Sequence, residues 1–252
     1  MKIVIKLETI LVLYLLAILW SCKSHYALVS SDRGKYSIDS QVPVDSSIVK
    51  TYWPYKEQMD AKMNQVIGHC AKELTKSYDL PETLLGNFFS DAVLAEGKKI
   101  DPSIDFAIPS TKGGMRNSLP KGDIHLSNVF ELMPFENEMV VLKLKGSDVE
   151  ELLNFIARSG GQPVAGLRMT IESQKPVNPL INGQSFDKNR TYLILTSDYV
   201  ANGGDHVGGF KDPLERRSLG LKIRDALINY IKTTTDAGKD INAELDGRIT
   251  KI

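Results

Sequence analysis

Residues 191–197 have the most regular alternation of side chains along the chain. The alternating positions are Tyr192, Ile194 and Thr196 on one side and Leu193, Leu195 and Ser197 on the other. A β-branched and aromatic run with a period of two is typical of a strand. We expect a tight turn at residues 202–204, because two adjacent glycines allow backbone angles that other residues avoid.

Two side chains flank this glycine turn. Tyr199 precedes it and Asp205 follows it. An aromatic ring offers a face to a base, and a carboxylate accepts hydrogen bonds from a sugar. The pattern favours a ligand with both features, whereas the alternative is an ordinary turn with Tyr199 in the core. His206 is either a ligand contact or a solvated turn residue.

Apolar residues recur at intervals of three and four in four further segments, which predicts four amphipathic helices. The longest covers residues 48–74, with Asp45 or Ser46 as the N-cap. The others cover residues 85–96, 147–158 and 218–232, and Ser147 with Glu150 predicts a capping box. The core-facing positions are Tyr52, Tyr55, Met59, Met63, Ile67, Cys70, Leu74, Phe88, Phe89, Ala92, Leu94, Val149, Leu152, Leu153, Ile156, Leu219, Ile223, Leu227, Tyr230 and Ile231.

Further strands are predicted between these helices, which indicates a mixed α/β domain without internal repeats. They cover residues 104–108, 122–130, 139–145 and 167–172, with an edge strand near residues 35–38. Two loops separate them. The first, residues 110–116, places a glycine pair before Arg116. The second, residues 133–137, carries Phe135, which either caps the core or forms a contact surface.

The N-terminus has the pattern of a bacterial lipoprotein signal. Lys2 and Lys6 precede an apolar run at residues 10–20, which is too short to span a membrane comfortably. Residues 19–22 resemble a lipobox, so we expect a signal peptide over residues 1–21, lipidation at Cys22, a tether over residues 22–37 and a bacterial envelope location. The alternative is an uncleaved N-terminal anchor. Cys70 then has no disulfide partner and is predicted to be a small buried side chain.

Composition narrows the class of protein. The chain has 252 residues, of which 42% are hydrophobic, and its 31 basic residues balance its 31 acidic residues. This fits one or two globular domains with a substantial core. The charge balance argues against a nucleic-acid partner.

Three motifs stand in a definite order along the chain. They are Gly86-Asn87-Phe88 with Asp91, Gly113-Gly114-Met115-Arg116 followed by Pro134-Phe135, and the segment from Tyr199 to Asp205. Together they resemble the C-terminal substrate-binding domain of the 5′-nucleotidases and UDP-sugar hydrolases, from about residue 38 to residue 231. The resemblance implies a layered α/β/β/α fold with mixed sheets over residues 38–252.

The resemblance also implies a nucleotide or nucleoside ligand and assigns roles to the loop residues. Phe135 and Tyr199 would clamp the base, Asp205 would hold the ribose, and Arg116 would lie near the ribose and phosphate. The remaining substrate-binding candidates are Thr111, Gly114, Asn202 and Gly204. Two positions depart from the family. Thr111 stands where the family usually has an asparagine, and residues 79–82 have no second phosphate-side arginine.

Nucleotidases of this type hydrolyse phosphate with two metal ions in a separate N-terminal metallophosphatase domain. This sequence has four histidines, and its one Asp-x-His, Asp123 to His125, lacks the expected partners. No nucleophile elbow, Walker loop or zinc-spaced cysteine pair occurs. We therefore expect no catalytic residue, metal or cofactor in this chain and a separate metallophosphatase as partner. The alternatives are an autonomous nucleoside-binding lipoprotein and a non-catalytic scaffold.

Overall fold

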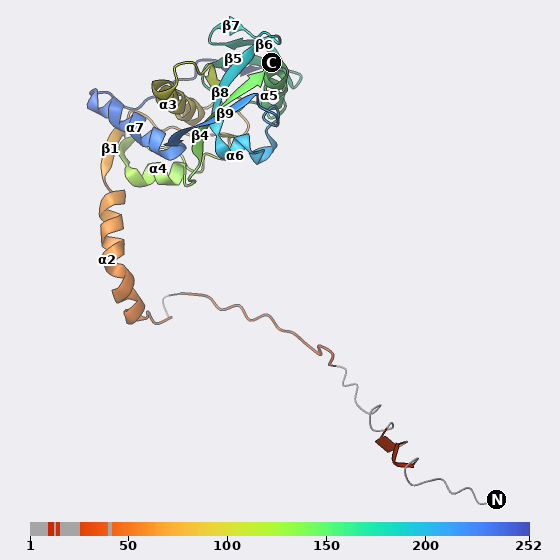
Figure 1. Ribbon diagram of the computed structural model, residues 1–252. Coiled ribbons are helices and arrows are strands. Elements are labelled where there is room, and N and C mark those ends of the chain that lie inside the picture. The colour runs from red at the N-terminus through yellow and green to blue at the C-terminus, as the bar shows by residue number, and fades with distance from the viewer. Residues whose placement is uncertain (1–9, 13, 16–25, 40–41) are drawn as a thin grey trace, which may run out of the picture. The chain divides into compact units, whose positions relative to one another are not determined.

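The computed structural model describes residues 10–12, 14–15, 26–39 and 42–252 (Figure 1). The chain divides into two units, Met1–Lys50 and Thr51–Ile252. Cys22 and most of the predicted signal peptide lie outside the described residues. Among the helices that are described, none combines the length and apolar character that a membrane span needs.

The first unit contributes the start of one helix, α2 (Ser46–Met63). Asp45 caps this helix as predicted, because its carboxylate accepts hydrogen bonds from the backbone N–H groups of Ser47, at 2.9 Å, and Ile48, at 3.3 Å. Residues 26–39 are exposed and form neither helix nor strand. The prediction of an edge strand at residues 35–38 is therefore wrong, since no strand of the described chain pairs with them.

The prediction that one helix runs through residues 48–74 and buries an apolar stripe is also wrong. Helix α2 ends at Met63 and has no buried residue. Strand β1 (Val66–Cys70) follows and pairs antiparallel with β3 (Gly122–His125). Pairing of Gly68 with Ile124 favours the strand, and glycine is a weak helix former. Cys70 is fully buried as predicted, but in a strand.

The strands of the described chain form three sheets. Besides the β1–β3 pair, there is a central sheet of order β2-β8-β4-β9 and an outer sheet of order β10-β5-β6-β7. Both combine one parallel pair, β2 with β8 and β10 with β5, with antiparallel neighbours. The bounds are β2 (Phe106–Ala107), β4 (Glu138–Lys145), β5 (Leu167–Glu172), β6 (Lys175–Ile181), β7 (Gln184–Ser185), β8 (Thr191–Ser197), β9 (Glu215–Lys222) and β10 (Ile249–Lys251).

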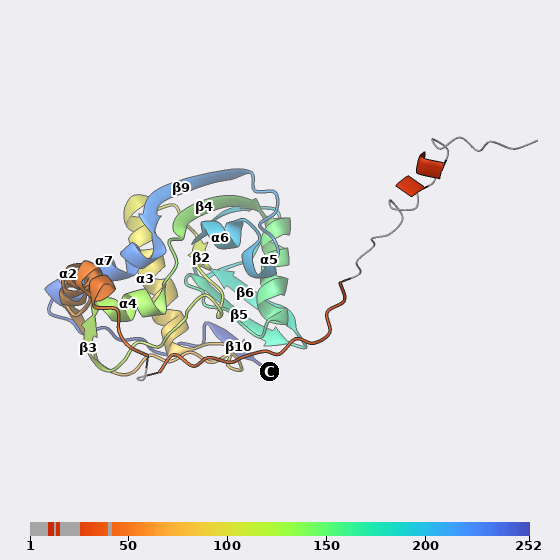
Figure 2. The same ribbon diagram turned by 90° about the horizontal axis from the view of Figure 1, so that it is seen from below.

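Both faces of the central sheet are covered, which produces two hydrophobic cores. Met139, Val141 and Leu195 pack into the first core with helices α3 (Leu84–Ile100) and α7 (Ile223–Asp236). The alternate residues Val140 and Ile194 pack into the second core with α5 (Gly146–Arg158) and the outer sheet. Figure 2 shows α3 and α7 on one side and α5, β5 and β6 on the other. The predicted mixed α/β fold with mixed sheets is confirmed.

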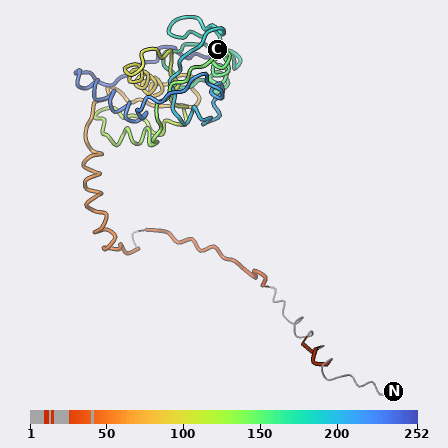
Figure 3. Tube along the Cα trace, in the orientation of Figure 1, coloured from red at the N-terminus to blue at the C-terminus, as the bar shows by residue number. Residues whose placement is uncertain are grey.

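Two predictions are wrong about the type of element, because the apolar spacing there fits both a helix and a strand. Residues 122–130 split into β3 and helix α4 (Leu126–Leu132), because Asn128 Oδ1 accepts the backbone N–H of His125 at 2.8 Å and starts a helix. Residues 218–222 belong to β9, which pairs with β4, and the last helix begins only at Ile223. In the tube of Figure 3, chain segments distant in sequence lie side by side in the second unit.

The helix over residues 147–158 is confirmed, but its predicted capping box is not present. Helix α5 begins at Gly146 with Lys145 as N-cap and no side-chain cap. Gly146 lies against the backbone of Lys188, so a side chain there would collide. Glu150 instead pairs with the Lys188 ammonium at 2.5 Å.

Candidate functional site

The register of the central sheet brings three loops to one edge. Strands β2 and β8 run parallel, with Phe106 opposite Ile194, so both end at the same edge. Strand β4 runs antiparallel to β8, with Met139 opposite Ser197, so β4 begins there. The loop after β2, the segment after β8 and the loop before β4 therefore meet.

The loop after β2, residues 110–116, is held from behind by a buried lysine. The Lys112 ammonium donates to the backbone oxygens of Tyr78, Leu80 and Gly160 at 3.1, 2.7 and 3.2 Å. Its backbone N–H donates to Gln162 Oε1 at 3.0 Å. Burial lowers the pKa of Lys112. These bonds satisfy the buried cation and set the path of the loop.

The segment after β8 carries the first aromatic wall. Helix α6 (Asp198–Ala201) begins with Ser197, whose hydroxyl caps it, and a 3-10 turn, η1 (Gly204–His206), follows. The Tyr199 hydroxyl donates to Asp205 Oδ1 at 2.9 Å, and the Thr111 hydroxyl donates to Asp205 Oδ2. The bond to Asp205 raises the pKa of the Tyr199 phenol. The Asp205 carboxylate therefore joins the segment after β8 to the loop after β2.

The loop before β4, residues 133–137, carries the second aromatic wall. Phe135 is 42% exposed and Tyr199 is 49% exposed, so the alternative that Tyr199 belongs to the core is wrong. The Asn137 amide Nδ2 donates to Asp198 Oδ1 at 3.1 Å, which links this loop to α6. Phe135 is therefore a surface aromatic at a loop junction.

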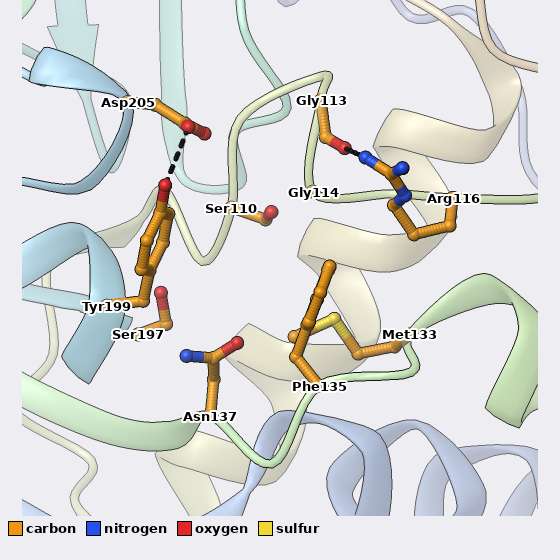
Figure 4. Close-up of a pocket in the computed structure, with 10 residues that line it drawn as sticks. All are labelled: Ser110, Gly113, Gly114, Arg116, Met133, Phe135, Asn137, Ser197, Tyr199 and Asp205. Carbon is orange, nitrogen blue, oxygen red and sulfur yellow. Dashed lines mark hydrogen bonds between the residues drawn. The ribbon is translucent and has the colours of Figure 1, made fainter. Parts of the chain in front are cut away.

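These segments enclose a cavity of about 260 Å³, close to the lower end of small-molecule sites. Its lining residues are Ser110, Gly113, Gly114, Arg116, Met133, Phe135, Asn137, Ser197, Tyr199 and Asp205. In Figure 4 the rings of Phe135 and Tyr199 lie on different sides of the space, and Arg116 lies at its far end from Tyr199. Carboxylate, hydroxyl, amide and guanidinium groups thus surround a gap between two aromatic side chains.

Five of the predicted site residues line this cavity: Phe135, Tyr199, Asp205, Arg116 and Gly114. The other three do not line it. Thr111 is buried and holds Asp205, and the Tyr199 ring lies against Gly204, where a Cβ would be 2.4 Å from the ring. Asn202 accepts a hydrogen bond from Arg216 at 2.6 Å and faces a neighbouring hollow, which His206 also lines. The binding roles of all eight stay predictions.

Four lining residues were not singled out from the sequence: Ser110, Met133, Asn137 and Ser197. Asn137 had a signal, since it stands two positions after Phe135 in the same loop. Ser197 closes the alternating run of β8, and its role depends on the helix that begins there. Ser110 and Met133 have no local signal.

No cluster of three or more His, Cys, Asp or Glu side chains that could hold a metal occurs among the described residues. His125 Nδ1 lies 2.9 Å from the backbone oxygen of Asn64. Residues 79–82 lack the second arginine of the family. In this segment Glu82 accepts hydrogen bonds from the backbone N–H groups of Asp246 and Gly247 at 2.9 and 3.0 Å. Glu82 therefore ties the C-terminal segment to the body.

A sequence model of the 5′-nucleotidase C-terminal domain matches residues 66–212, more than half of the chain. The chain belongs to this family. The match begins at β1 and covers all three loops of the cavity.

Relatives of this domain family are longer proteins. The chain is 26% identical over 247 residues to the trifunctional nucleotide phosphoesterase protein YfkN of Bacillus subtilis, and the match covers 89% of this chain and 17% of that protein. It is 25% identical to a 5′-nucleotidase of Vibrio cholerae, over 82% of this chain and 38% of that one.

The fold comparison agrees with the sequence comparison. A crystal structure of a 5′-nucleotidase precursor from Thermus thermophilus superposes with a TM-score of 0.67 and 26% identity, over 83% of this chain and 44% of that one. The chain thus spans less than half the length of these relatives.

Proposed function

We propose that the cavity binds the nucleoside part of a nucleotide, with the base between Phe135 and Tyr199 and the ribose on Asp205. The observation that carries the proposal is that these two rings, far apart in sequence, flank one cavity that also contains a carboxylate. Stacking of a base on an aromatic side chain contributes about 1–3 kcal/mol. The carboxylate suits a pair of sugar hydroxyls, because each oxygen accepts more than one hydrogen bond.

Asn137 supports a preference among bases. Its amide nitrogen donates one of its two hydrogens to Asp198, and its carbonyl oxygen is its hydrogen-bond acceptor at the cavity. A carbonyl oxygen accepts from the exocyclic amino group of adenine, guanine or cytosine, whereas uracil offers only its ring N3–H as a base donor. We therefore place adenosine, guanosine and cytidine above uridine as ligands.

Arg116 supports a phosphate at the mouth of the cavity. Its side chain is exposed and donates to the backbone oxygen of Gly113 at 3.3 Å, which leaves further N–H groups for a ligand. A guanidinium binds phosphate oxygens well in pairs. A nucleotide bound in this orientation would present its phosphate outward.

The outward phosphate leads to the second part of the proposal, which concerns catalysis. In our proposal a separate metallophosphatase, with divalent metals, hydrolyses the presented nucleotide, while a lipid on Cys22 holds this chain at the bacterial envelope. The names of the long relatives as nucleotidases support this division of work. The competing function is nucleoside binding without an enzymatic partner.

Thermal unfolding with ligands tests the binding proposal. A ligand that binds only the folded state at 100 times its Kd adds about 2.7 kcal/mol. For a domain of this size that raises Tm by roughly 5–10 °C. We expect this rise with AMP and adenosine and a smaller one with uridine, while ribose alone and inorganic phosphate serve as controls. No rise with any nucleoside or nucleotide at millimolar concentration would exclude the proposed site.

Phosphate release tests the partner. Adding the wild-type chain to a metallophosphatase from the same envelope should raise hydrolysis of AMP, and the Phe135→Ala variant should not. Ligand binding without this stimulation, and without co-purification of the two proteins, would favour the autonomous binding function.

A further inference from the structure

The loop at residues 133–137 has little structure of its own to hold Phe135 in place. Helix α4 ends at Leu132 and strand β4 begins at Glu138, and the residues between them form no helix or strand. Phe135 is 42% exposed and its ring has no polar atom. No hydrogen bond can hold this ring directly, so bonds to the rest of the loop, its backbone included, contribute to the position of the ring.

The first turn of α7 supplies that anchor. The Arg224 side chain is 7% exposed, and its Nη1 donates to the backbone oxygens of Met133, at 3.3 Å, and Phe135, at 3.4 Å. The backbone N–H of Ile223 donates to the oxygen of Asn137 at 2.9 Å. Two consecutive residues of α7 thus hold three carbonyl groups of the loop.

Two further contacts orient the Arg224 guanidinium. The guanidinium carbon Cζ of Arg224 lies 4.1 Å from the centre of the Phe130 ring on α4, within the range of a cation–π interaction. Its Nη2 pairs with the Glu136 carboxylate. A planar group with fixed donor directions can satisfy ring, carboxylate and carbonyls together, which a lysine ammonium cannot do from the same position.

We propose that Arg224 is a positioning residue that sets where the Phe135 ring stands opposite Tyr199. The inference rests on the proposed nucleoside site and adds a residue that does not line the cavity. If base stacking depends on the spacing of the two rings, release of the loop carbonyls weakens binding although no ligand contact is removed.

Lys222 offers a matched control on the same loop. Its ammonium pairs with the other carboxylate oxygen of Glu136, but its side chain is 43% exposed and no bond from it to a loop carbonyl is present. Loss of this exposed pair removes a positive charge near the loop without freeing Phe135. Exposed ion pairs contribute little to stability.

The experiment measures the Kd of adenosine by calorimetry, and Tm, for the full chain and its variants. We expect Arg224→Met to weaken adenosine binding at least tenfold and Lys222→Met to change it less than twofold. Arg224→Lys keeps the buried charge but reaches fewer carbonyls, so we expect a three- to tenfold loss. This variant carries the test if Arg224→Met does not fold.

A double variant separates positioning from general support of the fold. If Arg224 acts through the Phe135 ring, Arg224→Met adds less than a twofold loss in the Phe135→Ala background. The inference is overturned if either Arg224 variant binds adenosine as wild type does, or if the loss is the same with and without Phe135. Wild-type protein that binds no nucleoside would overturn both this inference and the proposed function, whereas wild-type binding with unchanged Arg224 variants overturns the inference alone.

Discussion

The two aromatic walls of the cavity are held in different ways. The Tyr199 ring is fixed directly, because its hydroxyl donates to Asp205 and its face lies against Gly204. The Phe135 ring has no such bond, and its loop is held through backbone carbonyls by α7. The anchor of Tyr199 is part of the cavity, whereas the Phe135 loop is held both by Asn137, which lines the cavity, and by Arg224, which does not.

This difference predicts different consequences of mutation. On the Tyr199 side, the anchor Asp205 is also the proposed ribose contact, so positioning and recognition cannot be separated by removing it. On the Phe135 side, in our proposal, Arg224 positions the loop and Phe135 contacts the base, so the two functions can be separated. Substitutions on the two sides should therefore differ in size and in their effect on sugar recognition.

The largest effect is expected from removing either ring. Phe135→Ala loses one stacking partner, about 1–3 kcal/mol or roughly 5- to 150-fold in the Kd of adenosine. Tyr199→Ala should cost more, since Asp205 also loses a hydrogen bond. Calorimetry measures both, and Tyr36→Ala in the exposed N-terminal segment is the control. Equal binding by Tyr199→Ala and wild type would refute the role of that wall.

The next effect concerns the sugar. Asp205→Asn keeps the shape of the side chain but removes its charge, and hydrogen bonds to charged groups contribute about 1.5–3 kcal/mol. We expect adenosine to bind at least tenfold more weakly and the preference for adenosine over 2′-deoxyadenosine to shrink. Phe135→Ala should weaken both ligands equally. An unchanged preference in Asp205→Asn would place the ribose elsewhere.

A smaller effect is expected from the glycine loop, which also lines the cavity. A Cβ at Gly114 would lie 1.9 Å from Ser110 Oγ, whereas a Cβ at Gly113 would approach nothing closer than 3.7 Å. Gly114→Ala should rotate the Ser110 hydroxyl and weaken adenosine binding about two- to fivefold, on the order of 0.5–1 kcal/mol. Gly113→Ala is the matched comparison in the same loop and should bind more tightly than Gly114→Ala, because its Cβ meets no atom this closely. Equal affinities of the two variants would show that Ser110 is not a contact.

The smallest expected effect is a pH dependence of the stability that the hydrogen bond between Tyr199 and Asp205 contributes. Because Asp205 raises the pKa of Tyr199 in the folded protein, the bond stabilises the fold fully below the unfolded pKa, about 10. This contribution is lost as pH rises through the raised folded value. The difference in phenolate absorbance between wild type and Tyr199→Phe should titrate above pH 10 and return toward 10 in Asp205→Asn. Titration of Tyr199 at its ordinary value would contradict the bond.

Much of the fold follows from local pattern. The alternation in β4, β5 and β8 and the helical spacing in α3 and α5 predicted those elements, because one face of each packs into a core. Prediction failed at β1, α4 and β9. There the apolar intervals fit both helix and strand, and pairing with a distant strand or a local cap decided the outcome.

The residues of the cavity also divide into those that the sequence predicted and those that it did not. The resemblance of the loop motifs to the nucleotidase family pointed to Phe135, Tyr199, Asp205, Arg116 and Gly114, and the glycine turn by itself drew attention to Tyr199 and Asp205. The part played by Thr111 could not be read, because its partner Asp205 lies on another loop. Asn137, Ser110, Met133 and Ser197 line the cavity through the register of β2, β4 and β8.

The sequence by itself indicated the family of this chain through its motifs, predicted part of its secondary structure and, through the family resemblance, five residues of the cavity, since motifs and apolar spacing depend on residues close together along the chain. The tertiary structure alone decided that Phe135 and Tyr199 flank one space, that Thr111 holds Asp205 and that Arg224 lies under the Phe135 loop. These contacts join residues distant in sequence, and they form only when β2, β4 and β8 pair in one register and α7 packs against the sheet they build.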